Sequence, residues 1–234
     1  MLNKTYPMKN LYLILFVFST CVFSQQKTIG EFTELIVKDG LHVTMIQGDM
    51  NAISITSKNE EGVTVINKDG RLKIGMKTFQ TLKGIDANIE LFFTGDIKTI
   101  NVSRGAYLSI LDTLQTQTLE IRSSKGAEVE LALLAKMAKY TAKTGGKIIV
   151  TGEVEEQQIR ISTGGMVDAR RSLSKQSVAT ITFGGSCEVQ ATTLFDLTTR
   201  FGGIGRVHGV PLTITHDKTL GGSLLFQNLG DKDE

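Results

Sequence analysis

The sequence predicts an all-β protein: a single-domain parallel β-solenoid (β-helix) with about seven coils of roughly 20 residues, preceded by longer strands that cap one end. Three observations support this fold class. Pairs of small residues recur at a nearly constant spacing. Apolar and polar residues alternate around each pair, and the 24 glycines with many Thr, Ile and Val residues suit short strands joined by tight turns.

The repeat is defined by seven pairs of small residues, each of which begins with glycine. They are Gly105-Ala106, Gly126-Ala127, Gly145-Gly146, Gly164-Gly165, Gly184-Gly185, Gly202-Gly203 and Gly221-Gly222. The first glycines are 18 to 21 residues apart, and the third and fifth positions after each are mostly apolar, as at Val129 and Leu131. A second short strand is predicted before each pair, as at Ile159 and Ile161. One coil is therefore predicted to consist of a strand, a glycine corner, a second strand and a loop. Such coils stack at about 4.8 Å.

One corner, Ser162-Thr163-Gly164-Gly165, has the glycines and hydroxyls of a phosphate-binding loop. Such a loop is followed by a helix whose N-terminus faces the anion, usually with a Lys-Ser or Lys-Thr pair. Here another strand follows, and the same corner recurs in every coil. We therefore interpret it as a place where the backbone turns and stacked coils approach closely.

The first 24 residues have the features of a secretory signal peptide. Lys4 and Lys9 precede an apolar stretch that is too short to span a membrane, and small residues place the cleavage site between Ser24 and Gln25. Lipid attachment at Cys21 is the alternative. The protein is therefore predicted to reach the periplasm, the outer membrane or the extracellular space.

Residues 28–95 are predicted to form the longer strands that cap the solenoid. Asp69-Gly70 lies between two alternating stretches and predicts a hairpin. Residues 96–229 hold the repeats, and residues 230–234 are a charged tail. Within the repeats, Leu131–Lys143 is rich in helix-forming residues, but Tyr140 and Ala142 align with the strand positions of the next coil, so a strand is predicted, with a short helical excursion as the alternative.

Composition excludes several classes of function. Without Lys4 and Lys9, 24 basic residues balance 24 acidic ones, so no nucleic acid partner is expected. The mature chain has no second apolar stretch that could form a transmembrane helix, and its single cysteine, Cys187, is interpreted as a small buried apolar residue. The three histidines lack the spacing of metal ligands, so no metal site and no cofactor are predicted.

Three stretches carry a resemblance to a known family. They are FTELIVKDGLHVTMIQGD (Phe32–Asp49), VTVINKDGRLKI (Val63–Ile74) and the repeated corners of the form S-x-G-[GA]-x-φ, where φ is apolar. In this order the chain resembles the GIN-domain family, the head domain of "putative auto-transporter adhesins", which is common in exported Bacteroidetes proteins. The resemblance covers nearly all of the mature chain. It implies a β-helical fold and an exported location, and it supplies no catalytic residues.

A pair of carboxylates is the strongest lead to an enzyme. Asp168 and Glu188 occupy equivalent outward positions on adjacent coils, and two carboxyl groups about 5 Å apart would suit a retaining glycosidase. The alternative is that Arg206, one coil further, pairs with Glu188 while Asp168 is solvated. We favour this alternative and predict that the protein is not an enzyme.

A basic strip is the second lead. It comprises Arg104, Arg122, Lys125, Lys143 and Arg160, all of which precede a glycine corner. Guanidinium and ammonium groups in such a row could bind the carboxylates or sulfates of an acidic glycan. The alternative is that these charges only keep the strands soluble.

Together these features predict an exported, non-catalytic, adhesin-like binding or structural protein of the cell envelope or surface. Its expected partner is a glycan or another envelope component, and copies of the chain could also pair through the ends of the solenoid. A glycan-active β-helix enzyme that uses Asp168 and Glu188 is the alternative.

Overall fold

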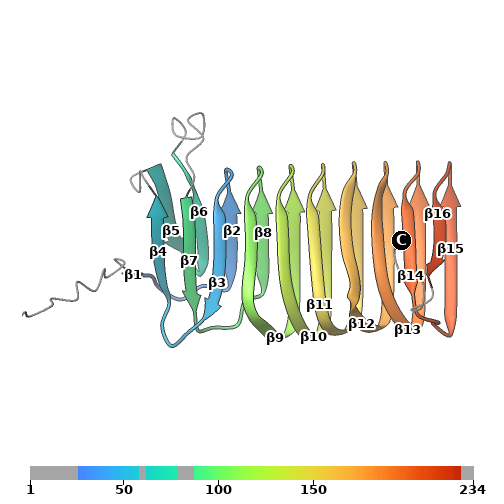
Figure 1. Cartoon of the computed structure of the whole chain (residues 1–234), viewed down its shortest axis with the longest axis horizontal. Helices are drawn as coiled ribbons and strands as arrows, with labels where there is room; N and C mark the ends of the chain where they lie inside the picture. Colours follow the sequence, from blue (N-terminus) through green and yellow to red (C-terminus); the bar gives the residue numbers. More distant parts are fainter. Residues whose placement is uncertain (1–25, 58–61, 78–86, 228–234) are drawn as a thin grey trace, which may run out of the picture.

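The computed structural model describes residues 26–57, 62–77 and 87–227, which form an elongated solenoid of stacked coils (Figure 1). The predicted signal peptide, its cleavage site, Cys21 and the tail at residues 230–234 lie outside the described residues. Within the described ranges, no helix has the length and apolar character needed to cross a bilayer. The all-β solenoid predicted from the sequence is confirmed.

The strands differ in length between the two parts of the chain. In order they are β1 (Lys27–Thr28), β2 (Glu34–Lys38), β3 (His42–Gln47), β4 (Ala52–Ser57), β5 (Val63–Lys68), β6 (Arg71–Met76), β7 (Ala87–Phe93), β8 (Thr99–Ser103), β9 (Tyr107–Ser124), β10 (Glu128–Lys143), β11 (Lys147–Ser162), β12 (Gly165–Thr182), β13 (Gly185–Arg200), β14 (Ile204–His208), β15 (Thr213–Thr219) and β16 (Ser223–Gln227). Strands β9 to β13 are 16 to 18 residues long, whereas the others have two to seven residues.

Two faces of mostly parallel strands enclose the core. The first face runs β1-β4-β7-β3, then the first parts of β9 to β13, then β14 and β16. The second face runs β5-β6-β2-β8, then the last parts of β9 to β13, then β15. Figure 1 shows the glycine corners along the top edge and the bends of the long strands along the bottom edge.

Each corner is a tight turn with at least two consecutive residues at positive φ. At the second corner, φ is 56° at Lys125 and 71° at Gly126, and the Ala127 N–H donates a hydrogen bond of 3.3 Å to the Ser124 carbonyl. Positive φ at both central residues is the pattern of a type I′ turn. Thr163 and Gly164 adopt the same conformation and β12 follows at once, so the interpretation of this stretch as a backbone corner is confirmed.

At the opposite edge the structure differs from the predicted loop between strands. β10 and β11 stay in register from Glu128↔Lys147 to Lys143↔Ser162, straight through the bend. The bend remains strand because neighbouring coils continue to satisfy its backbone N–H and C=O groups. The stretch Leu131–Lys143 lies within β10, so tertiary pairing overrides its preference for helix.

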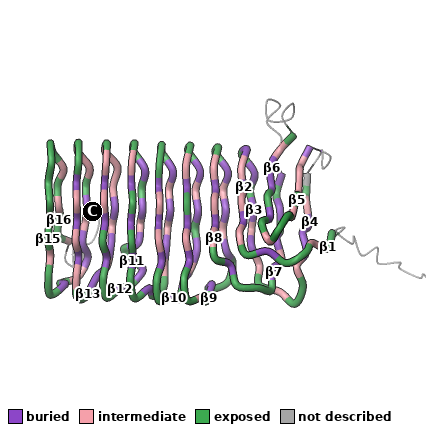
Figure 2. Tube along the Cα trace, turned by 180° about the vertical axis from the view of Figure 1, so that it is seen from behind, coloured by how far each residue is buried: buried purple, intermediate pink, exposed green. Residues whose placement is uncertain are grey.

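The core lies between the two faces and follows the predicted inward positions. Val129, Leu131, Ile159 and Ile161 are all buried, and buried and exposed residues alternate along the strands (Figure 2). Cys187 is completely buried among them, as expected from its inward position, and burial, aided by the charge of Glu188, raises the pKa of its thiol to about 12. The core is thus a narrow apolar column with little room for change.

Tyr140 is the largest of the fully buried side chains, and its hydroxyl has no hydrogen-bond partner among the described residues. A buried hydroxyl without a partner costs about 1–3 kcal/mol. We therefore expect Tyr140→Phe to raise the free energy of unfolding by about 1 kcal/mol, measured by urea denaturation. The control is Tyr107→Phe, which removes a hydroxyl that donates to Glu130 at 3.0 Å and should be neutral or slightly destabilising. A loss of stability in Tyr140→Phe would contradict this account.

The two ends of the solenoid differ. At the N-terminal end, β4 pairs antiparallel with β7 and β1, and β5 pairs antiparallel with β6 through the predicted Asp69-Gly70 hairpin. At the C-terminal end, Phe226 occupies an inward position but is 65% exposed, whereas the equivalent Val207 one coil earlier is fully buried. The described residues therefore leave the last coil uncovered on its outer side.

Candidate functional site

The second face carries a basic depression formed by the last parts of β9, β10 and β11. Outward residues alternate along each strand, and the parallel register places Arg122, Thr141 and Arg160 side by side in one row. Lys143 lies in the next row toward the corner. A shallow hollow of about 280 Å³ opens here, and it is lined by Asn101, Glu120, Arg122, Ser123, Ser124, Lys139, Thr141, Lys143 and Arg160.

The charges of this depression do not balance. Glu120 accepts ion pairs from Arg122 at 2.9 Å and from Lys139 at 3.4 Å. Lys143 and Arg160 have no carboxylate within 4.0 Å in the part of the chain that the structure describes, and both are exposed. Four cations against one carboxylate leave an excess of positive charge, surrounded by hydroxyl groups that can donate further hydrogen bonds.

The structure brings together only part of the predicted basic strip. Arg122, Lys143 and Arg160 meet in the depression, and Lys125 stands on the adjoining corner, where its backbone N–H donates to the Lys143 carbonyl. Lys139 belongs to the depression but was not predicted. The signal for it is its outward position on the same strand as Lys143, four residues earlier.

Arg104 lies apart from the depression, at the first corner of the repeats. Its Nη1 donates to Asp39 at 2.9 Å, and Asp39 also accepts from the Met76 N–H at 3.3 Å. Burial alone would raise the pKa of Asp39, but these hydrogen bonds and the charges of Lys38 and Arg104 lower it below its usual value. Arg104 therefore fastens the first coil to the capping strands.

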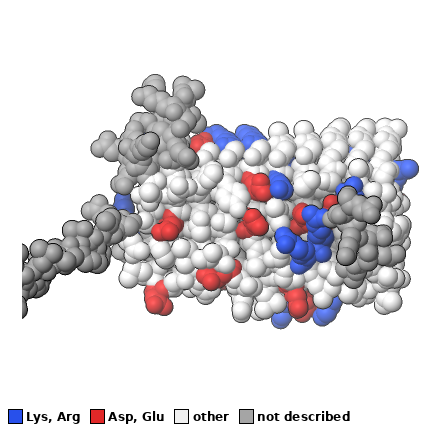
Figure 3. All heavy atoms as spheres, viewed as in Figure 1, with Lys and Arg blue, Asp and Glu red and all other residues white. Residues whose placement is uncertain are grey.

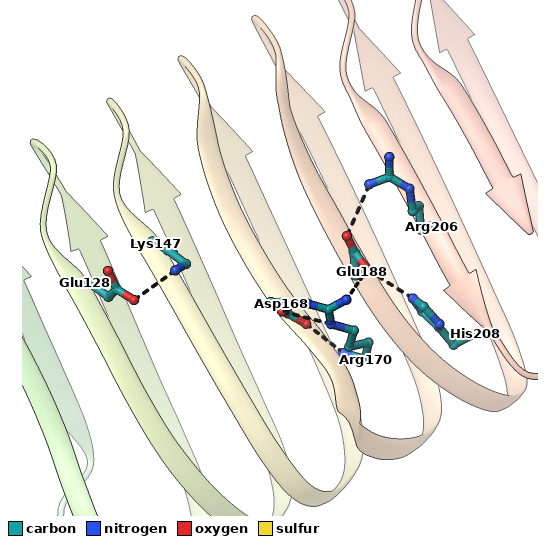
Figure 4. Close-up of polar contacts among 7 residues, drawn as sticks. All are labelled: Glu128, Lys147, Asp168, Arg170, Glu188, Arg206 and His208. Atoms are coloured by element: carbon teal, nitrogen blue, oxygen red, sulfur yellow. Dashed lines mark hydrogen bonds and ion pairs between the residues drawn. The ribbon is translucent and has the colours of Figure 1, made fainter. Parts of the chain in front are cut away.

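On the first face, Asp168 and Glu188 are direct neighbours in the register of β12 and β13, as predicted. Both carboxylates face cations (Figure 4). Asp168 binds Arg170 at 3.1 Å, and Glu188 binds Arg206 at 3.2 Å and His208 at 3.1 Å. Arg170 also reaches Glu188 at 3.8 Å, so one guanidinium bridges the pair. Asp168 is therefore paired rather than merely solvated.

Ion pairs between adjacent coils are general on this face. Lys147 binds Glu128 at 3.0 Å in the same manner (Figure 4). Residues of opposite charge lie side by side across the middle of this face in Figure 3. Among the residues that the structure describes, no cluster of His, Cys, Asp and Glu could hold a metal ion. The arrangement suits contact between coils more than attack on a bound sugar.

A groove of about 790 Å³ follows the bends along the bottom edge and was not predicted from the sequence. Its charged residues are Asp96, Lys136, Glu153, Glu155 and Lys175. Lys175 binds Glu155 at 3.2 Å, and the opposite charges of the groove nearly cancel. The smaller depression on the second face is the stronger candidate because its positive charge is unbalanced.

A family model described as "Putative auto-transporter adhesin, head GIN domain" matches residues 31–211 of the chain. This range includes the capping strands, the basic depression and the Asp168–Glu188 pair. The chain belongs to the GIN-domain family. The resemblance noted in the sequence is thus confirmed over most of the chain, including the first six of the seven corners that define its repeats.

Solved structures show the same architecture as this GIN domain. A "putative adhesin" from Bacteroides fragilis has a TM-score of 0.77 and 17% identity, over 88% of this chain and 95% of its own. A "putative lipid binding protein" from Parabacteroides distasonis (TM-score 0.67, 16% identity) and a "putative adhesin" from Parabacteroides merdae (TM-score 0.65, 19% identity) each cover 87% of this chain and 95% of their own. At these identities the likeness establishes the fold. Among proteins with curated functions, none matches the sequence of this GIN domain.

Proposed function

We propose that this GIN domain is an exported, non-catalytic binding protein that attaches to an acidic glycan of the envelope or cell surface. The observation that carries the proposal is the basic depression, where Lys143 and Arg160 stand exposed without a carboxylate partner among the described residues. Membership of an adhesin family agrees with a binding role. Sulfate or carboxylate groups of a glycan would supply the missing negative charge.

The depression is shallow and open, and it spans the equivalent strands of three coils. A linear polymer with repeated anionic groups fits such a surface, because successive charges can meet cations on successive coils. Each exposed contact contributes only about 1 kcal/mol, so affinity is expected to come from several contacts together and to fall with salt.

The test is binding to dextran sulfate, with neutral dextran as the reference polymer. Lys143→Glu combined with Arg160→Glu should weaken binding about tenfold or more, since two attractive contacts become repulsive. Biolayer interferometry at low and physiological salt would measure the change. The matched control is Lys136→Glu combined with Arg171→Glu, which makes the same change of charge on exposed residues of the bend edge.

If both double variants lost binding equally, the loss would result from the change in net charge alone. That result would contradict a specific binding site. Asp168→Asn with Glu188→Gln on the opposite face should leave binding unchanged. The same variant tests the enzymatic alternative, because a glycan-cleaving activity abolished by it would replace the binding proposal.

Pairing of two copies through their solenoid ends is a separate structural proposal, supported by the exposed inward position of Phe226. The described N-terminal end is built from antiparallel pairs that break the stacking of equal coils, so we place the contact at the C-terminal end. Two copies related by a two-fold axis would place β15 and β16 against antiparallel partner strands. Sedimentation equilibrium should then show dimers, which Phe226→Asp dissociates.

A further inference from the structure

The last three corners of the solenoid carry large apolar side chains where the earlier corners carry polar ones. The residue before the first glycine is Arg104, Lys125, Thr144, Thr163, Phe183, Phe201 and Leu220 in successive corners. Phe183, Phe201 and Leu220 are 61%, 49% and 75% exposed. We call these three residues the apolar ridge. Apolar side chains that remain this exposed do not stabilise the fold through the hydrophobic effect.

The backbone conformation makes the apolar ridge still more unusual. Phe183 has a φ of 58°, Phe201 of 56° and Leu220 of 53°. Bulky residues are strained in this left-handed region, where Asn, Asp and Gly are preferred. Aromatic side chains at these positions therefore oppose local preference, which is common at functional sites.

The apolar ridge lies in the turns of the last three corners. Each of these corners continues with two glycines, so no side chain follows Phe183, Phe201 or Leu220 within the turn. The two Phe rings stack with centroids 4.9 Å apart and planes 5° from parallel. Each ring covers one face of the other, so the two rings form one compact exposed apolar group, which suits insertion into an apolar medium.

The seven glycine corners carry basic residues and no acidic ones at their tips. In the seven corners, the two positions before the first glycine hold Arg104, Lys125, Lys143 and Arg200, and no carboxylate. Arg200 directly precedes Phe201 and is exposed, and Asp217 and Lys218 on β15 are the charged residues of the last coil. In Figure 3 the top edge is white above the last strands, and basic residues stand on it nearer the N-terminal end, beside an acidic group. This edge is complementary to a surface with an apolar interior and anionic groups.

We propose that the apolar ridge of Phe183, Phe201 and Leu220 inserts into an anionic lipid surface, with Arg200 and Lys125 contacting its headgroups. Peripheral binding of this kind grows with the apolar area inserted and with attraction to anionic lipids. The corners would meet the membrane edge-on, with the solenoid axis parallel to its plane, while the face that bears the basic depression stays accessible.

The test is co-sedimentation of the chain from Gln25 onward, which contains every described strand, with vesicles of phosphatidylcholine that contain or lack phosphatidylglycerol. The variant is Phe183→Asn combined with Phe201→Asn. Asparagine tolerates the left-handed region, so the thermal midpoint should stay equal or rise, while partition into anionic vesicles falls at least tenfold. The matched control, Thr144→Asn with Thr163→Asn at the same corner position, should bind vesicles as the parent does. Arg200→Gln should weaken binding only when phosphatidylglycerol is present.

Three outcomes would overturn the proposal. The parent protein could remain in the supernatant with anionic vesicles, or the Phe variant could bind them as well as the parent. Alternatively, the ridge could hold two copies together, seen as a dimer without vesicles that the Phe variant dissociates. Binding to dextran sulfate, measured in parallel, separates this surface from the basic depression, because the Phe variant should keep it and Lys143→Glu with Arg160→Glu should lose it.

Discussion

Replacing Gly165 by alanine is expected to lower the free energy of unfolding by about 3 kcal/mol or more, because overpacking against backbone leaves no side chain that can move aside. Gly165 is the second glycine of the fourth corner. A Cβ there would lie 2.6 Å from the carbonyl carbon of Ala142, one coil earlier, and against the carbonyl oxygen. The substitution would force two coils apart at a corner where their backbones are in close contact.

The adjacent Gly164 supplies a matched control. Its φ is 72°, and a Cβ there would have no heavy atom within 4 Å. Gly164→Asn introduces a larger side chain than alanine but should cost only a few tenths of a kcal/mol, because asparagine accepts the left-handed region. Urea denaturation of both variants measures the difference. Equal losses of stability would show that backbone conformation, and not the approach of the coils, makes these glycines necessary.

Replacing Asp39 by alanine should have the next largest effect, a loss of about 3 kcal/mol. The carboxylate is nearly buried and holds the Arg104 guanidinium and the Met76 N–H, so its removal takes the acceptor from the Met76 N–H and breaks the ion pair between the capping strands and the first coil. Alanine would also be strained at a φ of 69°. Asp39→Asn keeps the conformation and one acceptor, so it should cost about 1 kcal/mol.

The pH dependence of the Asp39→Asn effect follows from the lowered pKa of the carboxyl group. The native state favours the ionised form more than the unfolded state does, so this stabilisation is present in full above the unfolded pKa of about 3.9. It is lost as the pH falls through the lower native pKa. The stability difference between the parent and Asp39→Asn should therefore shrink below about pH 4. A difference that stayed constant down to pH 2 would contradict the role of the charge.

Several site features were predictable because they follow from the repeat. Equal positions in successive coils must be neighbours, so Asp168 beside Glu188 could be stated in advance, and so could Arg206 as a partner for Glu188. Arg170 could not, because it lies on the same strand as Asp168 and turns back across the coil to both carboxylates. A long side chain has many rotamers, and only the neighbouring coils select one.

The basic strip shows the same limit. Arg122, Lys143 and Arg160 meet in the depression, but no pattern in the sequence separates Arg104 from them. The separation depends on Asp39, which lies 65 residues away in the sequence and is turned toward Arg104 by its own corner. The capping strands do not follow the repeat of about 20 residues. Their contacts with the first coil therefore cannot be predicted from equivalent positions in successive coils.

By itself the sequence determined the period, the glycine corners and the inward positions of the core, because these depend on local alternation and on backbone geometry at each turn. The tertiary structure decided what happens between them. Contacts between coils make Leu131–Lys143 a strand and continue the backbone pairing through the bend between β10 and β11. They also determine which cations have a carboxylate partner among the described residues and which do not. The physical reason is that a coil of this size has little stability alone, so its backbone and charges take the arrangement that its neighbours satisfy.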